Sequence, residues 1–311
     1  MIQLTRTKTA APRKARLRAL PALIAALIAL QTAPAAAQEI TVSTARGEAT
    51  VSMAPENVAV FDIAAIDTLT AMGVDLAGVP DKLYVPYLSG VNAPQVGTLF
   101  EPNLEALAQI NPDLIVIGGR TAVQYDAVSK LAPTLDMTIS QDTINDARSR
   151  IESYGALFDK QDQATEMTMR FDASLKAAQD AVAGKGNGLI LMTNGPKVSA
   201  YGVGSRFGWI HSALGLPQAF DKLVPETHGD SVSFEFIAEV NPDWLIVIDR
   251  SVAVGEAASA DTTLDNPLIN GTTAAQKGQI VMLSPAPLYI AGGGYTAMTQ
   301  SFDEIATAFT K

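Results

Sequence analysis

Three arginines stand where apolar segments of this 311-residue chain end. Arg120, Arg206 and Arg250 each follow an apolar run of strand length and precede a new element. Parallel strands end at one edge of their sheet, where open α/β sheets bind ligands, so the three guanidinium groups are expected to converge. A guanidinium donates in a planar fork and stacks on aromatic rings, which suits a flat anionic ligand. The alternative is that each arginine pairs with a local acid such as Asp249.

The chain contains only two histidines. His228 lies in a polar Thr-His-Gly-Asp loop, whereas His211 lies in an amphipathic segment and is expected to be structural. Tyr289 precedes Ile-Ala-Gly-Gly-Gly, whose glycines let the backbone approach a neighbour closely. Taken alone, a loop histidine is usually solvated, and a tyrosine of this kind is more often part of a core. Together, His228 and Tyr289 offer one nitrogen and one hard oxygen donor, which suits Fe(III) when a chelator fills the other positions.

An internal repeat relates the two halves of the chain. A shift of 130 positions places residues 101–120 on residues 231–250, and both copies contain Asn-Pro-Asp and end in arginine. Each copy predicts an amphipathic helix that ends at Asn-Pro, followed by an apolar strand buried on both faces. The shift also superposes Glu105 on Glu235. One surface glutamate is normally just solvated, but a symmetric pair is better explained by a symmetric partner.

The order of elements predicts an α/β fold with two Rossmann-like lobes, built on mainly parallel sheets and joined by a long rigid helix. Residues 144–182 are polar with helical spacing and lack proline, which predicts one or two long helices between the lobes. The expected domains are an N-terminal α/β lobe (38–143), an interlobe backbone helix (144–183) and a C-terminal α/β lobe (184–311). Two helices are also expected, at 121–130 and, at the end of the chain, 296–309. The remaining expectations are a leading β-hairpin at 38–53 and loops at 257–263 and 285–294.

The N-terminal segment, residues 1–37, is predicted to be a signal peptide. A basic stretch without acids precedes an apolar core at Ala19–Leu30, and Ala35–Ala37 is a small-residue cleavage site. The alternative is an uncleaved membrane anchor, but the apolar core is short for a span. The prediction is an exported protein located in the periplasm and cleaved near Ala37.

Composition excludes several function classes. The chain has 22 Lys and Arg against 32 Asp and Glu, and removing the basic leader makes it still more acidic, which argues against nucleic acid or an anionic membrane surface as the partner. Cysteine is absent, so disulfides, thiol catalysis and a lipid-modified cysteine are excluded. The glycines of residues 202–208 fit neither a dinucleotide nor a phosphate loop, and no Gly-x-Ser-x-Gly occurs. What remains at residues 202–208 is a tight strand-to-helix turn that presents Arg206.

Three motifs together resemble a known family. Thr-His-Gly-Asp-Ser-Val, Val-Ile-Asp-Arg and Leu-Tyr-Ile-Ala-Gly-Gly-Gly, at 227–232, 247–250 and 288–294, resemble the periplasmic substrate-binding proteins of ABC importers for iron-siderophores and vitamin B12. Within that family, the motifs look like the branch that binds ferric catecholate siderophores. The repeated Glu-x-x-Ala-x-x-Asn-Pro-Asp unit is moderately specific for the same fold.

The resemblance implies a role for each singled-out residue. His228 and Tyr289 would complete the coordination of iron held by a bis-catecholate, and Arg120, Arg206 and Arg250 would surround the anionic catecholates. Glu105 and Glu235 would dock the protein onto arginines of a dimeric inner-membrane ABC permease. The protein would be a monomer without an intrinsic cofactor, and its ligand an Fe(III)-siderophore. The alternatives are a binding protein for a hydroxamate siderophore, haem or cobalamin, and, from another class, an exported hydrolase.

Overall fold

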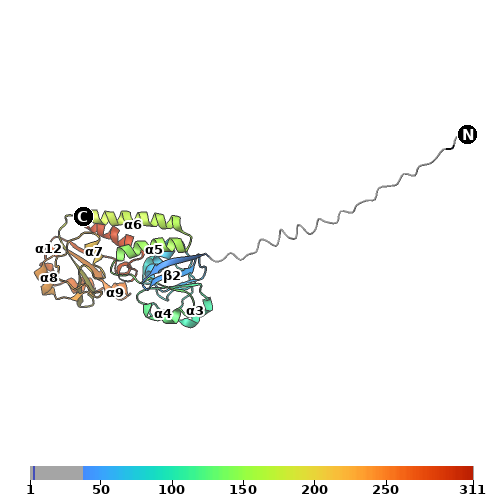
Figure 1. Ribbon diagram of the computed structural model, residues 1–311. Coiled ribbons are helices and arrows are strands. Elements are labelled where there is room, and N and C mark those ends of the chain that lie inside the picture. Colours follow the sequence, from blue (N-terminus) through green and yellow to red (C-terminus); the bar gives the residue numbers. More distant parts are fainter. Residues whose placement is uncertain (1–2, 4–37, 311) are drawn as a thin grey trace. The chain divides into compact units, whose positions relative to one another are not determined.

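A three-stranded and a five-stranded β-sheet, together with a two-stranded hairpin, organise the chain in a computed structural model that describes residues 38–310 and Gln3 (Figure 1). The predicted signal peptide lies outside the described residues, apart from Gln3. Within the described part of the chain, no helix is both long enough and apolar enough to cross a membrane. We call the part around the first sheet the N-terminal lobe and the part around the second sheet the C-terminal lobe.

The N-terminal lobe contains a three-stranded parallel sheet in the order β3–β4–β5. All residues of these strands are buried, as expected for apolar parallel strands covered on both faces. The predicted leading hairpin is present as the antiparallel pair β1–β2. The elements of this lobe are β1 (Glu39–Thr44), β2 (Gly47–Ser52), β3 (Val58–Val60), α2 (Ile63–Ala71), η1 (Pro86–Leu88), α3 (Leu104–Ile110), β4 (Leu114–Ile117), η2 (Ala122–Gln124), α4 (Tyr125–Val128) and β5 (Thr134–Asp136).

The C-terminal lobe contains a five-stranded mixed sheet in the order β10–β9–β6–β7–β8. Strands β10, β9 and β6 are parallel, whereas β7 and β8 join by antiparallel pairing. The elements of this lobe are β6 (Gly188–Asn194), β7 (Lys197–Tyr201), α7 (Trp209–Ser212), β8 (Asp230–Ser231), α8 (Phe234–Val240), β9 (Trp244–Asp249), α9 (Arg250–Ala253), α10 (Ala260–Leu264), α11 (Pro267–Asn270), α12 (Thr273–Gln276), β10 (Ile280–Met282), α13 (Pro285–Tyr289) and α14 (Tyr295–Thr310).

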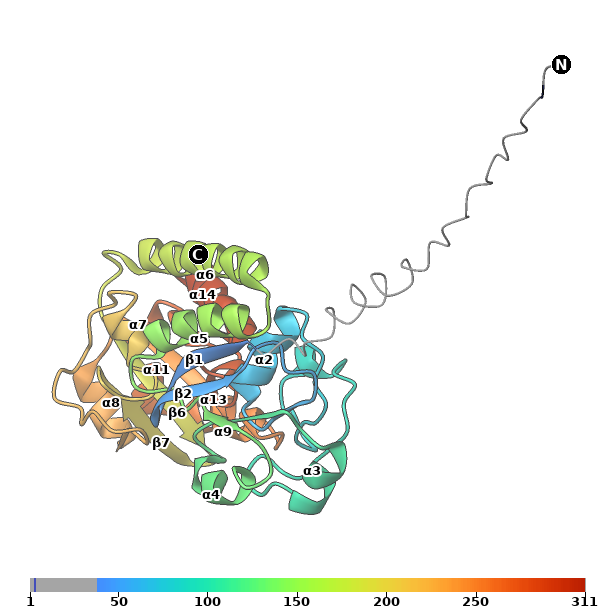
Figure 2. The same cartoon turned by 45° about the vertical axis from the view of Figure 1, so that its right-hand side comes forward.

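The predicted interlobe segment folds as two helices, α5 (Thr143–Leu157) and α6 (Gln161–Val182). The break falls at Asp159, whose φ of 54° is left-handed. Helices α5 and α6 run alongside one another, and α14 packs against α6 (Figures 1 and 2). Phe171 of α6 meets Phe302 of α14 edge to face, with ring centroids 5.3 Å apart. The C-terminal helix α14 therefore packs firmly against the segment that connects the lobes.

The repeated Asn-Pro-Asp triplet has the same structural use in both lobes. Asn111 and Asn241 end α3 and α8 in the left-handed conformation, with φ of 48° and 47°, which asparagine tolerates better than most residues. The carboxylate of Asp113 then accepts from the backbone amide of Asn57, and that of Asp243 accepts from the amide of Asn187. Each aspartate thus fixes the entry to the neighbouring strand, which confirms the predicted helix–turn–strand repeat.

Three local expectations were wrong. Residues 285–294 were expected to form a loop, but they begin with the helix α13. Proline fits the first turn of a helix, where no intrahelical donor is lost, and the carboxylate of Glu304 binds the backbone amide of Ser284 just before it. The expected loop at 257–263 contains the start of α10, and the expected helix at 121–130 is divided into η2 and α4.

Candidate functional site

The three arginines converge on one residue, Tyr289, at the end of α13. Arg120 Nη2 donates to the Tyr289 carbonyl oxygen at 2.6 Å, and Arg206 Nη2 donates to the same oxygen. Arg250 Nε donates to the Tyr289 hydroxyl at 3.3 Å. Arg120 follows β4 in the N-terminal lobe, whereas Arg206 follows β7 and Arg250 follows β9 in the C-terminal lobe. The site therefore joins both lobes, and the three arginines converge as predicted. The predicted reason holds for Arg120 and Arg250, which follow parallel strands, but is wrong for Arg206, because β7 is antiparallel to β6 and the loop after β7 carries this arginine to the others.

The Tyr289 ring lies in the middle of the guanidinium groups. The guanidinium carbon is 4.4 Å from the ring centroid for Arg206, 5.6 Å for Arg120 and 5.7 Å for Arg250. These separations are within the range of cation–π attraction. Helix α13, which carries the tyrosine, packs on α9, which begins with Arg250 (Figure 2). One aromatic ring thus helps to hold three like charges in one place.

No carboxylate neutralises this cluster within the described part of the chain, where none of the three arginines forms an ion pair. The proposed local acid, Asp249, accepts instead from the backbone amides of Ser251, Ser259 and Ala260. The alternative of local acid pairing is therefore wrong. The arginines present an uncompensated positive surface, which favours an anionic ligand.

Burial and mutual repulsion act on the charged state of these arginines. Burial, followed by the nearby charge of Arg120, lowers the pKa of Arg206 to about 10. Burial also lowers the pKa of Arg120, although Tyr289 and Asp62 oppose this effect. Both guanidinium groups remain protonated at neutral pH, so a bound anion would stabilise charges that the fold has already partly removed from water.

The same cluster makes Tyr289 acidic for a tyrosine. Burial raises the pKa of Tyr289, but the hydrogen bond from Arg250 and the charges of Arg206 and Arg120 outweigh burial, so its pKa lies below the ordinary value. The phenolate is the form that binds a hard metal ion. The cluster thus makes the phenolate form of Tyr289 easier to reach than that of an ordinary tyrosine.

We expect the titration of Tyr289 to be separable from that of the other tyrosines. An ultraviolet absorbance titration should show a tyrosine phase below the ordinary phenol pKa, and the Tyr289→Phe variant should lack it. Arg250→Met should move this phase to higher pH, because it removes both a hydrogen-bond donor and a positive charge. An unchanged phase in Tyr289→Phe would assign the low pKa to another tyrosine. Tyr201 provides contrast, since burial raises its pKa to about 12.

The structure places the two histidines in different settings. His211 is buried and its Nδ1 lies 2.9 Å from the carbonyl oxygen of Leu216, which confirms its structural role. His228 is exposed in the turn before β8 and forms no ion pair or side-chain hydrogen bond with residues 38–310. In the same range, no three His, Cys, Asp or Glu side chains are placed to hold a metal ion. Iron coordination by His228 and Tyr289 stays a prediction.

Glu105 and Glu235 occupy equivalent positions on the two lobes. Each is the second residue of its helix, in α3 and α8, and each is exposed. Hydrogen bonds from its own backbone amide and from Ser233 lower the pKa of Glu235. The sequence repeat thus becomes a pair of solvent-facing carboxylates, and their docking role stays a prediction.

The sequence did not identify two residues beside the arginines. Asn194, at the end of β6, accepts from Arg250 Nη1 at 3.2 Å. Tyr84 has a left-handed φ of 65°, which is rare for a large side chain and is found where a structure over-determines the backbone. Both lie in polar or proline-rich stretches without periodicity, so no sequence signal distinguished them.

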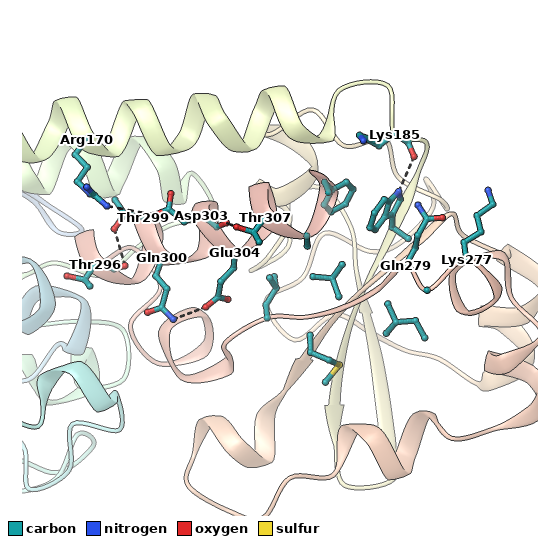
Figure 3. A pocket seen from close by; sticks show the side chains of 18 residues that line it. Arg170, Lys185, Lys277, Gln279, Thr296, Thr299, Gln300, Asp303, Glu304 and Thr307 are labelled. Carbon is teal, nitrogen blue, oxygen red and sulfur yellow. Dashed lines mark hydrogen bonds and ion pairs between the residues drawn. The ribbon is translucent and has the colours of Figure 1, made fainter. Parts of the chain in front are cut away.

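A groove of about 970 Å³ beside β10 and α14 is a second candidate site (Figure 3). Most of its charged side chains already have partners: Asp303 lies 3.9 Å from Arg170, and Lys277 lies 3.8 Å from Asp243. The carboxylate of Glu304 accepts from Gln300 and Ser284. The unpaired arginines, rather than this groove, therefore form the stronger candidate for binding a charged ligand.

Comparisons with known proteins agree on one family. A family model described as periplasmic binding protein matches residues 58–287. The petrobactin-binding protein YclQ of Bacillus subtilis is 36% identical over 264 residues, 83% of each chain. The ferric-anguibactin-binding protein FatB of Vibrio anguillarum is 29% identical over 85% of each chain.

Solved structures agree with these sequence matches. The crystal structure of YclQ superposes with a TM-score of 0.83 at 34% identity, covering 88% of this chain and 99% of that one. The periplasmic catecholate-siderophore binding protein VctP of Vibrio cholerae superposes with a TM-score of 0.81 at 28% identity, covering 87% of this chain and 100% of that one. These matches confirm the predicted α/β architecture. The chain belongs to the periplasmic binding protein family.

Proposed function

We propose that this protein captures a ferric catecholate siderophore between its two lobes and delivers it to an ABC permease in the inner membrane. The observation that carries the proposal is the cluster of three arginines around Tyr289, drawn from both lobes, none of which forms an ion pair with a carboxylate of residues 38–310. A neutral ligand would leave these charges uncompensated.

The charge of the ligand fits the cluster. Ferric iron carries a net charge of about −3 with three catecholates and about −1 with two, whereas the chain as a whole is acidic, so a local group of cations is needed to hold such a complex. Catecholate oxygens are planar and anionic, which suits the fork of a guanidinium. Relatives named for petrobactin, ferric anguibactin and a catecholate siderophore support this ligand class.

Tyr289 and His228 are proposed to complete the coordination of iron when the siderophore is tetradentate. Two catecholates occupy four of six octahedral positions, which leaves two for a phenolate and an imidazole. The lowered pKa of Tyr289 supports the phenolate, and His228 is exposed in the turn before β8, which leaves its ring free to approach a bound complex. With a hexadentate siderophore, both side chains would stand aside.

The protein is proposed to act in the periplasm as a monomeric carrier without turnover. Its family consists of substrate-binding proteins. The predicted signal peptide, residues 1–37, would direct the chain across the inner membrane, and cleavage near Ala37 would leave β1 near the mature N-terminus. The ligand is cargo, so no resident cofactor is proposed.

A fluorescence titration tests the ligand class. Trp209 lies three residues after Arg206 and Trp244 begins β9, so a coloured ferric complex in the site should quench both. We expect quenching by ferric bis-catecholate and none by cobalamin or a ferric hydroxamate. A charge-transfer circular dichroism band at the iron should accompany binding. Preference for either control ligand would overturn the proposed ligand.

Changing Glu105 and Glu235 together to alanine should separate transport from binding. Both carboxylates are exposed in the first turn of their helices, and neither takes part in the hydrogen bonds of Arg120, Arg206 or Arg250. Ligand affinity should therefore be unchanged. Iron uptake by cells should fall severalfold, because each lobe loses the charge proposed to meet the permease. The exposed Glu239→Ala variant on α8 serves as the matched control. Normal uptake by the double variant would reject the docking role.

A further inference from the structure

Lys82 of the N-terminal lobe reaches across to the C-terminal lobe beside the arginine cluster. Its Nζ donates to the carbonyl oxygen of Val254 at 2.9 Å. The amide of Val254 in turn donates to the carbonyl oxygen of Arg250 at 3.1 Å, which completes the single turn of α9. The lysine ammonium therefore contacts the backbone about one helical turn, roughly 5–6 Å along the axis, from Arg250.

The chain beyond Val254 leaves room for this approach. Gly255 has a φ of +84°, a conformation that favours glycine. A Cβ atom at this position would lie 2.8 Å from Lys82 Nζ, closer than van der Waals contact allows. The glycine thus allows both the backbone turn after α9 and the position of the ammonium.

Tyr84 connects Lys82 to the other side of the cluster. Lys82 Nζ lies 4.6 Å from the centroid of the Tyr84 ring, within cation–π range. Tyr84 is also close enough to Arg120 to contribute to its electrostatic environment. The left-handed backbone of Tyr84, which carries this half-buried ring, is a conformation that persists only where the surrounding structure holds it. Lys82 therefore contacts the end of α9, which begins with Arg250, and also the ring of Tyr84, which acts on Arg120.

Lys82 has donors to spare. An ammonium has three N–H donors, and the carbonyl of Val254 accepts one of them. Within residues 38–310, Lys82 forms no ion pair, and its side chain is exposed. A lysine on a flexible stem can exchange a carbonyl for a stronger, charged acceptor with little rearrangement.

We propose that Lys82, supported by the Tyr84 ring, is a fourth cationic contact for the ligand and makes the site favour complexes of higher negative charge. The proposal rests on the proposed function, because it concerns the same ligand. The ammonium would exchange the Val254 carbonyl for an anionic oxygen at the edge of the complex. The three arginines bind the anionic core of the complex, and Lys82 discriminates by total charge.

The test is a fluorescence titration of Lys82→Met, Lys82→Arg and Lys277→Met with ferric tris-catecholate and ferric bis-catecholate at low and high salt. Lys277 is the matched control, since it is an exposed lysine 3.8 Å from Asp243 in the other candidate groove. We expect Lys82→Met to weaken tris-catecholate binding about 2- to 5-fold at low salt, the range for exposed charge pairs. The loss should be smaller for the bis-catecholate complex and smaller at high salt.

The outcomes separate this inference from the proposed function. If Lys82→Arg retains affinity and Lys277→Met binds as the original chain does, the contact is one of charge and the proposal is supported. If Lys82→Met loses the same affinity for both complexes, Lys82 is only a spacer between the lobes and the proposal is overturned. The proposal is also overturned if Lys82→Met and Lys277→Met bind the complexes with equal affinity. Failure of the unaltered chain to bind either complex would instead reject the proposed function.

Discussion

Replacing Arg206 with alanine is expected to weaken the binding of ferric bis-catecholate by roughly 10- to 100-fold. The loss corresponds to about 1.5–3 kcal/mol, the usual worth of a charged hydrogen bond. Arg206 is the arginine nearest to the Tyr289 ring, at 4.4 Å, and it shares the Tyr289 carbonyl with Arg120. Its guanidinium is already partly desolvated, so little further desolvation opposes contact with the ligand.

Two further variants make this result specific. Arg206→Lys should recover only part of the affinity, because an ammonium keeps the charge but lacks the planar fork. Arg170→Ala removes an exposed arginine on α6, 3.9 Å from Asp303, and should leave affinity unchanged. Isothermal titration calorimetry at fixed ionic strength would measure the affinity of each variant for the ferric bis-catecholate. Equal affinity in Arg206→Ala and Arg170→Ala would remove the anion site from this cluster.

The second large effect is expected from the double variant His228→Ala with Tyr289→Phe. A tetradentate complex should lose roughly 100-fold or more in affinity, since even residues behind a metal ligand cost 10- to 100-fold when changed. A hexadentate complex already fills all positions around iron and should lose little. Phe keeps the backbone carbonyl to which Arg120 and Arg206 donate, but it removes the hydroxyl that accepts from Arg250. The hexadentate complex measures the effect of losing that one hydrogen bond, so the difference between the two complexes reports coordination.

Affinities for the two complexes should be measured in parallel with the visible circular dichroism of the iron centre. Loss of handedness in the tetradentate complex would accompany the loss of affinity, because two protein ligands on one side of the iron select its configuration. Each single variant should give part of the effect. Equal losses for tetradentate and hexadentate complexes would reject coordination and leave His228 and Tyr289 as packing residues.

Both predictions depend on an arginine cluster assembled before the ligand arrives. The carbonyl oxygen of Tyr289 accepts from both lobes, and its ring and hydroxyl face the guanidinium groups. Holding three long side chains in this way removes rotamer entropy that binding would otherwise have to overcome. The backbone at the end of α13 therefore acts as an internal acceptor that prepares the site for an anion.

The sequence by itself determined the helix–turn–strand unit that occurs in both lobes, and it placed an arginine after the strand of each copy. Asn111 and Asn241 end helices, and the apolar runs after them form buried parallel strands, through signals that are local or strongly periodic. The strand-entry contacts of Asp113 and Asp243 each join residues 56 positions apart, so they depend on the fold. Because parallel strands end at one edge of a sheet, Arg120 and Arg250 were predictable as candidate site residues. Arg206 follows the antiparallel strand β7, so only the fold explains why it joins them.

The tertiary structure decided what the arginines contact. The sequence allowed Asp249 to pair with Arg250, but in the fold that carboxylate is used by the amides that follow β9, and Tyr289 comes close only because α13 packs on α9. The contact of Lys82 with Val254 joins residues 172 positions apart, and the φ of Tyr84 has no periodic signature. Contacts between distant segments depend on how helices pack across two sheets, and neither spacing nor propensity encodes that packing.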